Sequence, residues 1–297
     1  MSARRDLLPV NADGLRRRRA VNRVMEAIAT LAAFAAVGVL AIMVISVARR
    51  GGAAINFSLF TKTPHPFSFT NEPSGLANAF VGTFVIVGFA TAIAVPVGVL
   101  SAIYLAEFAR ARVAFAIALA LDVLNGVPAI VVGIFVFALI VLHHGQSALA
   151  GSFALSILMI PLIARATQEV LALVPQTTRE ASLGLGVSRW RTTLGVVLPQ
   201  TVGGIVTGTT LAVARVAGET APLLFTSSIV GDKLQWSPHQ ALASVPLKIF
   251  EYSESPDPKD HAQAWAAALV LIGFVLVASL TARALTARSR RRMGLHR

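Results

Sequence analysis

Long apolar runs alternate with short polar segments along most of this sequence. A helix needs about 20 largely apolar residues to cross the ~30 Å hydrocarbon core of a lipid bilayer. Six runs approach or exceed that length and predict six transmembrane helices, at Val24–Val47, Leu76–Leu105, Gly126–Leu142, Ser152–Val174, Val202–Thr226 and Ala262–Ala282. The pattern therefore predicts an all-α, polytopic membrane protein with both termini on one side of the membrane.

Some of the shorter segments carry structural signals of their own. Residues Ala106–Asn125 mix charged and apolar side chains and end in an Asn-Gly-Val-Pro break, which predicts a helix at the membrane interface that leads into the third span. The segments Ile55–Gly75 and Ser227–His261 hold several prolines each, so we expect irregular or partly helical loops there. Gly204 and Gly208, four residues apart in the fifth run, favour close helix packing.

Composition narrows the class of protein further. The chain has 297 residues, of which 55% are hydrophobic and 13% are charged, whereas about a quarter of the residues in an average soluble protein are charged. This excludes an ordinary soluble enzyme, a disordered chain and a nucleic-acid-binding module, despite a formal net charge of +12. The absence of cysteine excludes disulfides, thiolate metal sites and a cysteine nucleophile. We expect no metal site and no nucleic acid partner.

The basic residues indicate how the spans are oriented, because Lys and Arg are concentrated in the cytoplasmic segments of membrane proteins. Of the 26 Lys and Arg residues, 18 fall in the two terminal tails and in the segments 106–125 and 175–201, and six fall in the segments on the opposite side. We therefore expect both tails and the loop 175–201 to face the cytoplasm, and the loop 227–261 to face outward.

Two charged residues, Arg215 and Glu219, lie inside the fifth predicted span. On a continuous helix their four-residue spacing places both on one face. An unpaired Arg at the bilayer centre costs about 2.5–17 kcal/mol, depending on the method, so we expect both side chains to point into the helix bundle. They could form an ion pair that locks helices together, or they could line a polar pathway. A guanidinium in such a pathway suits an oxyanion, because its planar donors match carboxylate or phosphate oxygens.

A second pair with the same spacing, Arg165 and Glu169, lies near the expected cytoplasmic end of the fourth span. Long charged side chains reach the aqueous interface from such positions at low cost, so an interfacial role is the simpler interpretation. Both residues remain secondary candidates for a translocation path.

The loop before the fifth span carries the most specific motif, REASLGLGVSRWRTTLGVVLPQ, at Arg179–Gln200. It resembles the loop signature of ABC importer permeases, in which Glu-Ala-Ala, Gly and Ile-x-Leu-Pro recur at fixed spacing; the matching residues are Glu180, Ala181, Ser182, Gly186, Val196, Leu198 and Pro199. Ser182 in place of Ala and Val196 in place of Ile are small departures. From the residues alone we expect a short amphipathic helix over Glu180–Leu185, followed by a turn at Gly186.

Further stretches resemble the permeases of phosphate-specific ABC importers: Gly75–Phe80, Ile103–Phe108, Val127–Val136 and Ala214–Thr226. The resemblance implies a type I ABC importer permease fold in a bacterial cytoplasmic (inner) membrane, with inorganic phosphate as cargo. It also implies three partners: a homologous second permease subunit, an ATPase dimer and an extracytoplasmic phosphate-binding protein. By the same resemblance, Arg215 and Glu219 lie in the translocation path, and the loop 175–201 couples to the ATPase.

The resemblance and the hydropathy pattern together suggest a division of the chain into four parts. These are a cytoplasmic basic tail at residues 1–23, a first span with its outer loop at 24–75, a permease domain at 76–285 that contains the coupling loop 175–201, and a second cytoplasmic basic tail at 286–297.

The source of energy is expected to lie outside this chain. The phosphate-binding sequence GxxxxGK[ST] is absent, so we expect a transport subunit rather than an enzyme, with no cofactor of its own and with ATP and Mg²⁺ on the ATPase subunit. A permease for another oxyanion, such as sulfate or molybdate, is the nearest alternative. An ion-coupled secondary transporter is less favoured, because the sequence shows no internal inverted repeats.

Overall fold

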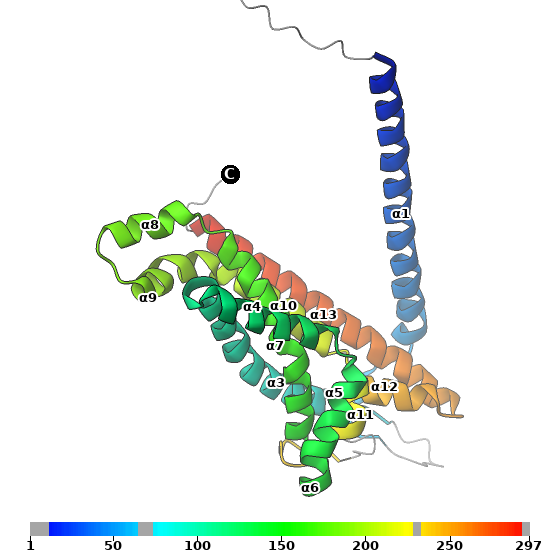
Figure 1. Ribbon diagram of the computed structural model, residues 1–297. Coiled ribbons are helices and arrows are strands. Elements are labelled where there is room, and N and C mark those ends of the chain that lie inside the picture. The colour runs from blue at the N-terminus through cyan, green and yellow to red at the C-terminus, as the bar shows by residue number, and fades with distance from the viewer. Residues whose placement is uncertain (1–11, 65–73, 228–232, 293–297) are drawn as a thin grey trace, which may run out of the picture. The chain divides into compact units, whose positions relative to one another are not determined.

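All of the regular structure in this chain is helical wherever the computed structural model describes it, over residues 12–64, 74–227 and 233–292. The chain divides into two compact units after Arg50. The first unit contains the long helix α1 (Ala12–Gly52) as far as Arg50 (Figure 1). The last two residues of this helix, Gly51 and Gly52, belong to the second unit. The predicted all-α fold class is confirmed.

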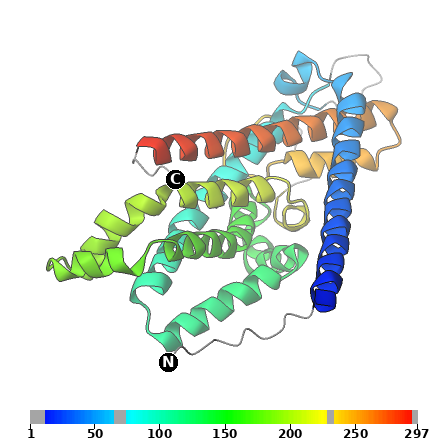
Figure 2. The same ribbon diagram turned by 90° about the horizontal axis from the view of Figure 1, so that it is seen from above.

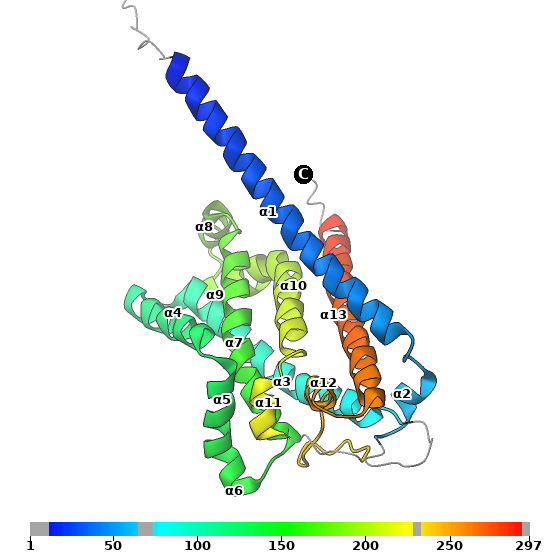
Figure 3. The ribbon, with the colours of Figure 1, turned by 90° about the vertical axis from the view of Figure 1, so that its right-hand side faces the viewer.

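The second unit contains the remaining helices. In chain order these are α2 (Phe57–Thr61), α3 (Ala77–Ile103), η1 (Tyr104–Phe108), α4 (Ala111–Gly126), α5 (Ala129–Val136), η2 (Phe137–Val141), α6 (Leu142–His144), α7 (Ala148–Ala172), α8 (Gln176–Gly184), α9 (Arg189–Thr192), η3 (Thr193–Val197), α10 (Leu198–Val216), α11 (Ala221–Thr226), α12 (Val245–Ser253) and α13 (Pro258–Arg292). The elements written η are short π-helical turns, which widen a helix locally. Helix α8 and the C-terminal end of α13 lie at one end of this unit, and α6, α11 and α12 lie at the other (Figures 1 and 3).

Among the described residues, five helices are long and apolar enough to cross a bilayer: Arg17–Gly52, Ala77–Phe108, Ala148–Ala172, Arg189–Val216 and Pro258–Thr281. The predicted third span differs from the others, because α4 and the segment Ala129–His144 meet at an angle of 99°. The number of spans reaches the predicted six if this bent pair counts as one. Pro128 explains the bend, since proline lacks an N–H group and disfavours a helical conformation in the residue before it. The helix expected over Ala106–Asn125 is present as α4 but begins later, at Ala111, because residues 106–108 belong to η1 at the end of the preceding helix.

The prediction of a continuous fifth span over Val202–Thr226 is wrong at both ends. The helix begins earlier, at Arg189, and ends at Val216. A short non-helical link then leads to α11. Pro222 accounts for this link, because its ring would clash with the backbone carbonyl of Gly218 in a continuous helix.

Helices α3, α7 and α10 pack together as the core of the second unit, and α13 packs against α10 (Figure 2). The central helix is α7, whose inward-facing side chains are fully shielded from solvent: Leu155, Met159 and Ile163. A Cβ added at Gly204 would lie 2.5 Å from Val170 Cγ1, and one added at Gly208 would lie 2.5 Å from the Cβ of Ala166. The close packing predicted for these two glycines is therefore confirmed.

The segment Ser237–Ser244 closes the end of the second unit opposite α8, and we call it the outer strap; its last three residues, Leu242, Ala243 and Ser244, are buried. The carbonyls of Pro238 and Gln240 accept hydrogen bonds from the first two N–H groups of α7, at 2.9 and 2.8 Å. The Oγ of Ser147 caps the same helix end by accepting a hydrogen bond from the N–H of Ala150, at 3.1 Å. The unpaired N–H groups at the start of a helix need such partners, so the strap provides hydrogen-bond acceptors for the N-terminal end of α7.

The outer strap is also fixed to α3. The N–H of Val245, directly after the strap, donates to Thr83 Oγ1 at 2.8 Å. Gly82 lies so close to the carbonyl of Ala243 that a Cβ at this position would overlap it. The partly helical loop expected over Ser227–His261 thus contains this strap and helix α12, while residues 228–232 lie outside the described ranges.

Candidate functional site

The first half of the signature loop folds into a helical hairpin made of α8 and α9 (Gln176–Thr192), which we call the coupling hairpin (Figure 1). At its tip Gly186 has a φ of +80°, and its N–H donates to the carbonyl of Leu183 at 2.9 Å. The N–H of Val187 donates to the carbonyl of Ser182 at 3.3 Å. These two bonds form a Schellman motif, in which glycine is strongly favoured at the left-handed position. The predicted short helix and glycine turn are both confirmed, although the helix starts one turn earlier than expected.

Most of the surface of α8 is exposed to solvent. Its outer residues include Glu180, Ala181 and Leu183, and Leu185 at the tip is 84% exposed. Ser182 is the buried exception, and its hydroxyl lies 2.9 Å from the hydroxyl of Thr192 in α9. The two arms of the hairpin are therefore joined on the inside, while the outside exposes a carboxylate and apolar side chains.

The second half of the signature is helical, so the loop predicted over 175–201 is shorter than expected. Leu198 and Pro199 form the first turn of α10, directly after the wide turn η3. Pro199 accounts for this wide turn, because it has no N–H to donate and its ring crowds the carbonyl of Gly195. The hydroxyl of Thr201 donates to the carbonyls of the two residues before Pro199, at 3.1 and 3.0 Å.

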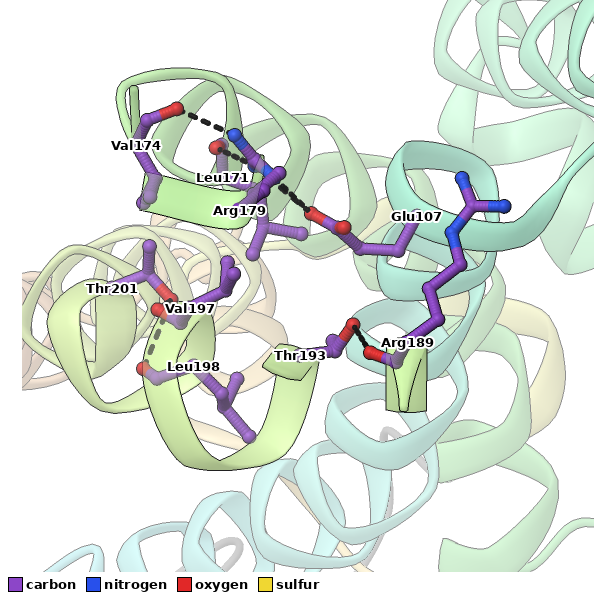
Figure 4. Close-up of polar contacts among 9 residues, drawn as sticks. All are labelled: Glu107, Leu171, Val174, Arg179, Arg189, Thr193, Val197, Leu198 and Thr201. Carbon is purple, nitrogen blue, oxygen red and sulfur yellow. Dashed lines mark hydrogen bonds and ion pairs between the residues drawn. The ribbon is translucent and has the colours of Figure 1, made fainter. Parts of the chain in front are cut away.

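Sequence reasoning did not single out Arg179, which anchors the coupling hairpin to the bundle (Figure 4). Its Nε and Nη2 donate to Oε1 of Glu107, at 3.1 and 2.9 Å. Its Nη1 and Nη2 donate to the carbonyls of Val174 and Leu171 near the C-terminal end of α7, at 2.5 and 2.8 Å. One guanidinium therefore joins η1, α7 and α8.

The ion pair of Glu107 and Arg179 is buried: the side chains are 6% and 15% exposed. A buried carboxylate is costly unless it is paired. One feature of the sequence indicated this pair. Glu107 is the single acidic residue in the otherwise apolar stretch Ile103–Phe108, and a carboxylate buried in the bundle needs a cationic partner.

The structure separates Arg215 from Glu219. Arg215 lies in the last turn of α10 with its side chain exposed on the surface of the chain, and Glu219 lies half-buried in the link to α11. Within the described part of the chain, neither side chain has a hydrogen-bond or ion-pair partner. The expectation of two charges on one helix face inside this chain's own bundle is therefore wrong, because the helix ends at Val216.

Arg215 belongs to a face of α10 that this chain covers only in part. The residues on this face follow helical spacing, and Gln200, Leu211 and Arg215 are exposed while Thr207 is half-buried. Lipid disfavours a face with an arginine and an amide. The composition of the face therefore fits a polar path or a protein neighbour better than it fits lipid.

Arg165 pairs with Asp122 of α4 rather than with Glu169. Its Nε donates to Oδ1 of Asp122 at 2.9 Å, its Nη1 to Oε1 of Gln168 at 3.0 Å, and its Nη2 to the carbonyl of Ala118 at 3.1 Å. Glu169 and Asp122 are both exposed. Arg165 therefore fastens α4 to α7 at the surface of the chain, which favours the interfacial interpretation over a place in a translocation path.

A helical membrane bundle with an exposed coupling hairpin and an open polar face is the architecture of a type I ABC importer permease. The family model of the binding-protein-dependent transport system inner membrane component matches residues 94–291, and the chain belongs to this family. The family consists of multi-pass inner-membrane transport components that work with an ATPase and a binding protein and are not themselves enzymes.

Relatives along most of the chain have a more specific name, phosphate transport system permease protein PstA. The protein of Haemophilus influenzae is 41% identical over 238 residues, which cover 79% of this chain and 82% of the relative. That of Xylella fastidiosa is 38% identical over 281 residues, which cover 93% and 96%. PstA 1 of Mycobacterium tuberculosis is 41% identical over 229 residues, which cover 74% and 73%.

The fold is also similar to that of a solved structure. A chain of the methionine ABC transporter MetNI, in an inward-facing conformation, superposes with a TM-score of 0.56 over 71% of this chain and 93% of that chain. The two sequences are only 17% identical. This similarity concerns the fold alone and agrees with the predicted type I ABC importer permease architecture.

Proposed function

We propose that this chain is the permease subunit of an ATP-driven importer that carries inorganic phosphate across the bacterial inner membrane. The observation that carries the proposal is the identity of 38–41% to phosphate transport permeases, over up to 93% of this chain. The exposed guanidinium of Arg215 supports it, because planar N–H donors match the oxygens of phosphate. Glu219, next to the same helix end, is the second residue that we propose for the translocation path.

The proposed importer contains further subunits. A homologous second permease subunit covers the partly open face of α10, so that Arg215 lies between the two permeases. An ATPase dimer binds the coupling hairpin, whose exposed Glu180 and Leu185 support such a contact. An extracytoplasmic phosphate-binding protein delivers phosphate at the opposite end. ATP and Mg²⁺ bind to the ATPase, and this chain binds no cofactor.

We propose that both termini and the coupling hairpin face the cytoplasm and that the outer strap faces outward. The C-terminal end of α13 lies at the same end of the second unit as α8 (Figure 3). The hairpin carries Arg179, Arg189 and Arg191, and the end of α13 is rich in arginine, as cytoplasmic segments are. The division into tails, first span and permease domain at residues 23, 75 and 285 remains part of this proposal.

Phosphate uptake tests the proposed function directly. Cells without phosphate importers of their own would express this chain together with the proposed partners, and uptake of radiolabelled phosphate would be measured. We expect uptake that stops when the ATPase is inactivated and that excess sulfate or molybdate does not inhibit. Inhibition by those anions would favour another oxyanion as cargo. Uptake that survives ATPase inactivation but stops when the proton gradient collapses would favour a secondary transporter.

A further inference from the structure

Two consecutive residues of η1 hold the two arms of the coupling hairpin. Glu107 accepts the hydrogen bonds of Arg179 from α8. Phe108, the next residue, lies under the guanidinium of Arg189 from α9, with 5.8 Å between Cζ and the ring centroid. Guanidinium groups at this distance from an aromatic ring are attracted to its face. The short turn η1 therefore contacts both arms at once, and Figure 4 shows the contact of Glu107 with Arg179.

Few other contacts connect α8 to the bundle. Its outer residues are exposed, and its inner hydroxyl, on Ser182, contacts the other arm of the hairpin rather than the bundle. A cavity of about 610 Å³ lies beside the ion pair, lined by α4, by the end of α7 and by both arms of the hairpin. The side of α8 toward α4 is therefore not closely packed. Besides the chain connections to α7 and α10, Arg179 therefore provides a direct side-chain link from α8 to η1.

The turn η1 is the end of the long helix α3. Residues Ala77–Phe108 form 32 residues of nearly continuous helix, which is roughly 48 Å at the rise of an α-helix. At the other end, Thr83 accepts the hydrogen bond of Val245, and Gly82 contacts the outer strap at Ala243. One helical element, with Pro96 inside it and η1 at its end, therefore connects the hairpin to the strap.

We infer that Glu107 and Arg179 are positioning residues that transmit movement of the coupling hairpin through α3 to the outer strap. The inference rests on the proposed function, since it assigns the source of the movement to the ATPase on the hairpin. The buried ion pair forces η1 to follow α8, because separating the pair would leave two uncompensated charges in the bundle. The contact of Phe108 with Arg189 makes η1 follow the second arm of the hairpin as well.

The test is the ratio of phosphate moved to ATP hydrolysed, measured in proteoliposomes with the complete importer. Glu107→Gln keeps the size of the side chain and removes its charge. We expect assembly with the ATPase and ATP hydrolysis to continue while the ratio falls about tenfold, a typical size for a coupling effect. Arg179→Lys should act in the same direction, because an ammonium group cannot make the forked contacts of Arg179.

A matched control is the exposed ion pair of Asp122 with Arg165, which also joins two helices of this chain. Asp122→Asn should leave the ratio unchanged. An unchanged ratio in the assembled Glu107→Gln importer would show that the pair is merely structural and would overturn the inference.

If Glu107→Gln does not assemble with the ATPase, the contact between Phe108 and Arg189 provides a second test of the inference. Phe108→Leu and Arg189→Gln change exposed side chains, and each should lower the ratio about twofold with normal assembly, in line with a modest cation–π contact. A wild-type ratio in both would overturn the inference. Failure of the wild-type chain to take up phosphate at all would instead contradict the proposed function.

Discussion

The side chain of Arg215 lies in the last turn of α10, whereas Glu219 lies beyond the end of that helix, so the two charges do not share a helix face. The end of α10 between them, and the lack of an ion pair joining them in the described part of the chain, remove the main argument for a structural ion pair within this chain. The C-terminal end of α10 carries a partial negative charge from its open carbonyls, and a cation in the last turn is favourable there. Arg215 is thus stabilised locally while its guanidinium stays available for contacts outside this chain.

The first prediction concerns Arg215. Because the side chain is exposed and not paired with Glu219, Arg215→Gln should change the stability of the isolated chain by no more than about 0.5 kcal/mol. We expect phosphate uptake to be lost, also in the double variant Arg215→Gln with Glu219→Gln, since the path would lack its positive charge. Arg215→Lys should retain part of the uptake, because it keeps the charge without the planar donors.

The measurements are thermal unfolding in detergent, copurification with the ATPase, and phosphate uptake. Wild-type uptake by the well-assembled double variant would rule out a role for these residues in the translocation path. A large loss of stability in Arg215→Gln would instead indicate that the arginine holds the fold.

The second prediction concerns the tip of the coupling hairpin. Gly186 has open space around the position of a Cβ but a φ of +80°, so the strain of a substitution comes from the backbone and not from a clash. Gly186→Val should distort the Schellman motif and reduce both ATPase binding and uptake, because a β-branched residue resists positive φ. Gly186→Asn should be milder, since asparagine tolerates this conformation. Equal behaviour of the two variants in a copurification assay would argue against this explanation.

The third prediction concerns helix packing around Gly208. A Cβ at this position would lie 2.5 Å from the Cβ of Ala166, so Gly208→Val should cost about 1–3 kcal/mol by overpacking and lower the midpoint of thermal unfolding. Gly195, in the π-helical turn η3 that leads into α10, has no neighbour within 4 Å of a Cβ. Gly195→Ala is therefore the matched control and should leave the midpoint unchanged or raise it. A similar midpoint for both variants would contradict the packing argument.

The fourth prediction concerns orientation in the membrane. The chain has no cysteine, so single cysteines can be introduced without a background. Leu185→Cys at the tip of the hairpin should react with a membrane-impermeant thiol reagent only after the cells are opened. His239→Cys, at an exposed position of the outer strap, should react in intact cells. The reverse pattern would invert the proposed topology.

Most of the fold was predictable from the sequence, because five of the six apolar runs correspond to helices long and apolar enough to cross a bilayer. The short helix of the hairpin and the turn at Gly186 were also predictable, since both depend on local residues. The start of the fifth span was misplaced because Arg189 and Arg191 suggested a solvated loop. In the structure these two arginines lie on the first turn of a helix whose apolar part follows.

The site was less predictable than the fold, because its contacts join residues far apart in the chain. Glu107 and Arg179 are 72 positions apart, and no local pattern links them. Arg165 had a plausible partner at helical spacing in Glu169, but Asp122 on another helix competes better for its guanidinium. The break between Arg215 and Glu219 was visible in principle, since Pro222 stands four residues after Gly218.

The hydrogen bonds of the outer strap also fix an order of events during synthesis. The N–H groups of Ala148 and Leu149 depend on carbonyls that lie about 90 residues later in the chain, at Gln240 and Pro238. At roughly 5–20 residues per second, the ribosome makes the strap several seconds after the start of α7. During that interval α7 begins without its final partners, and the outer end of the unit closes only when the C-terminal part of the chain arrives. A chain that stops before Pro238 never acquires this closure.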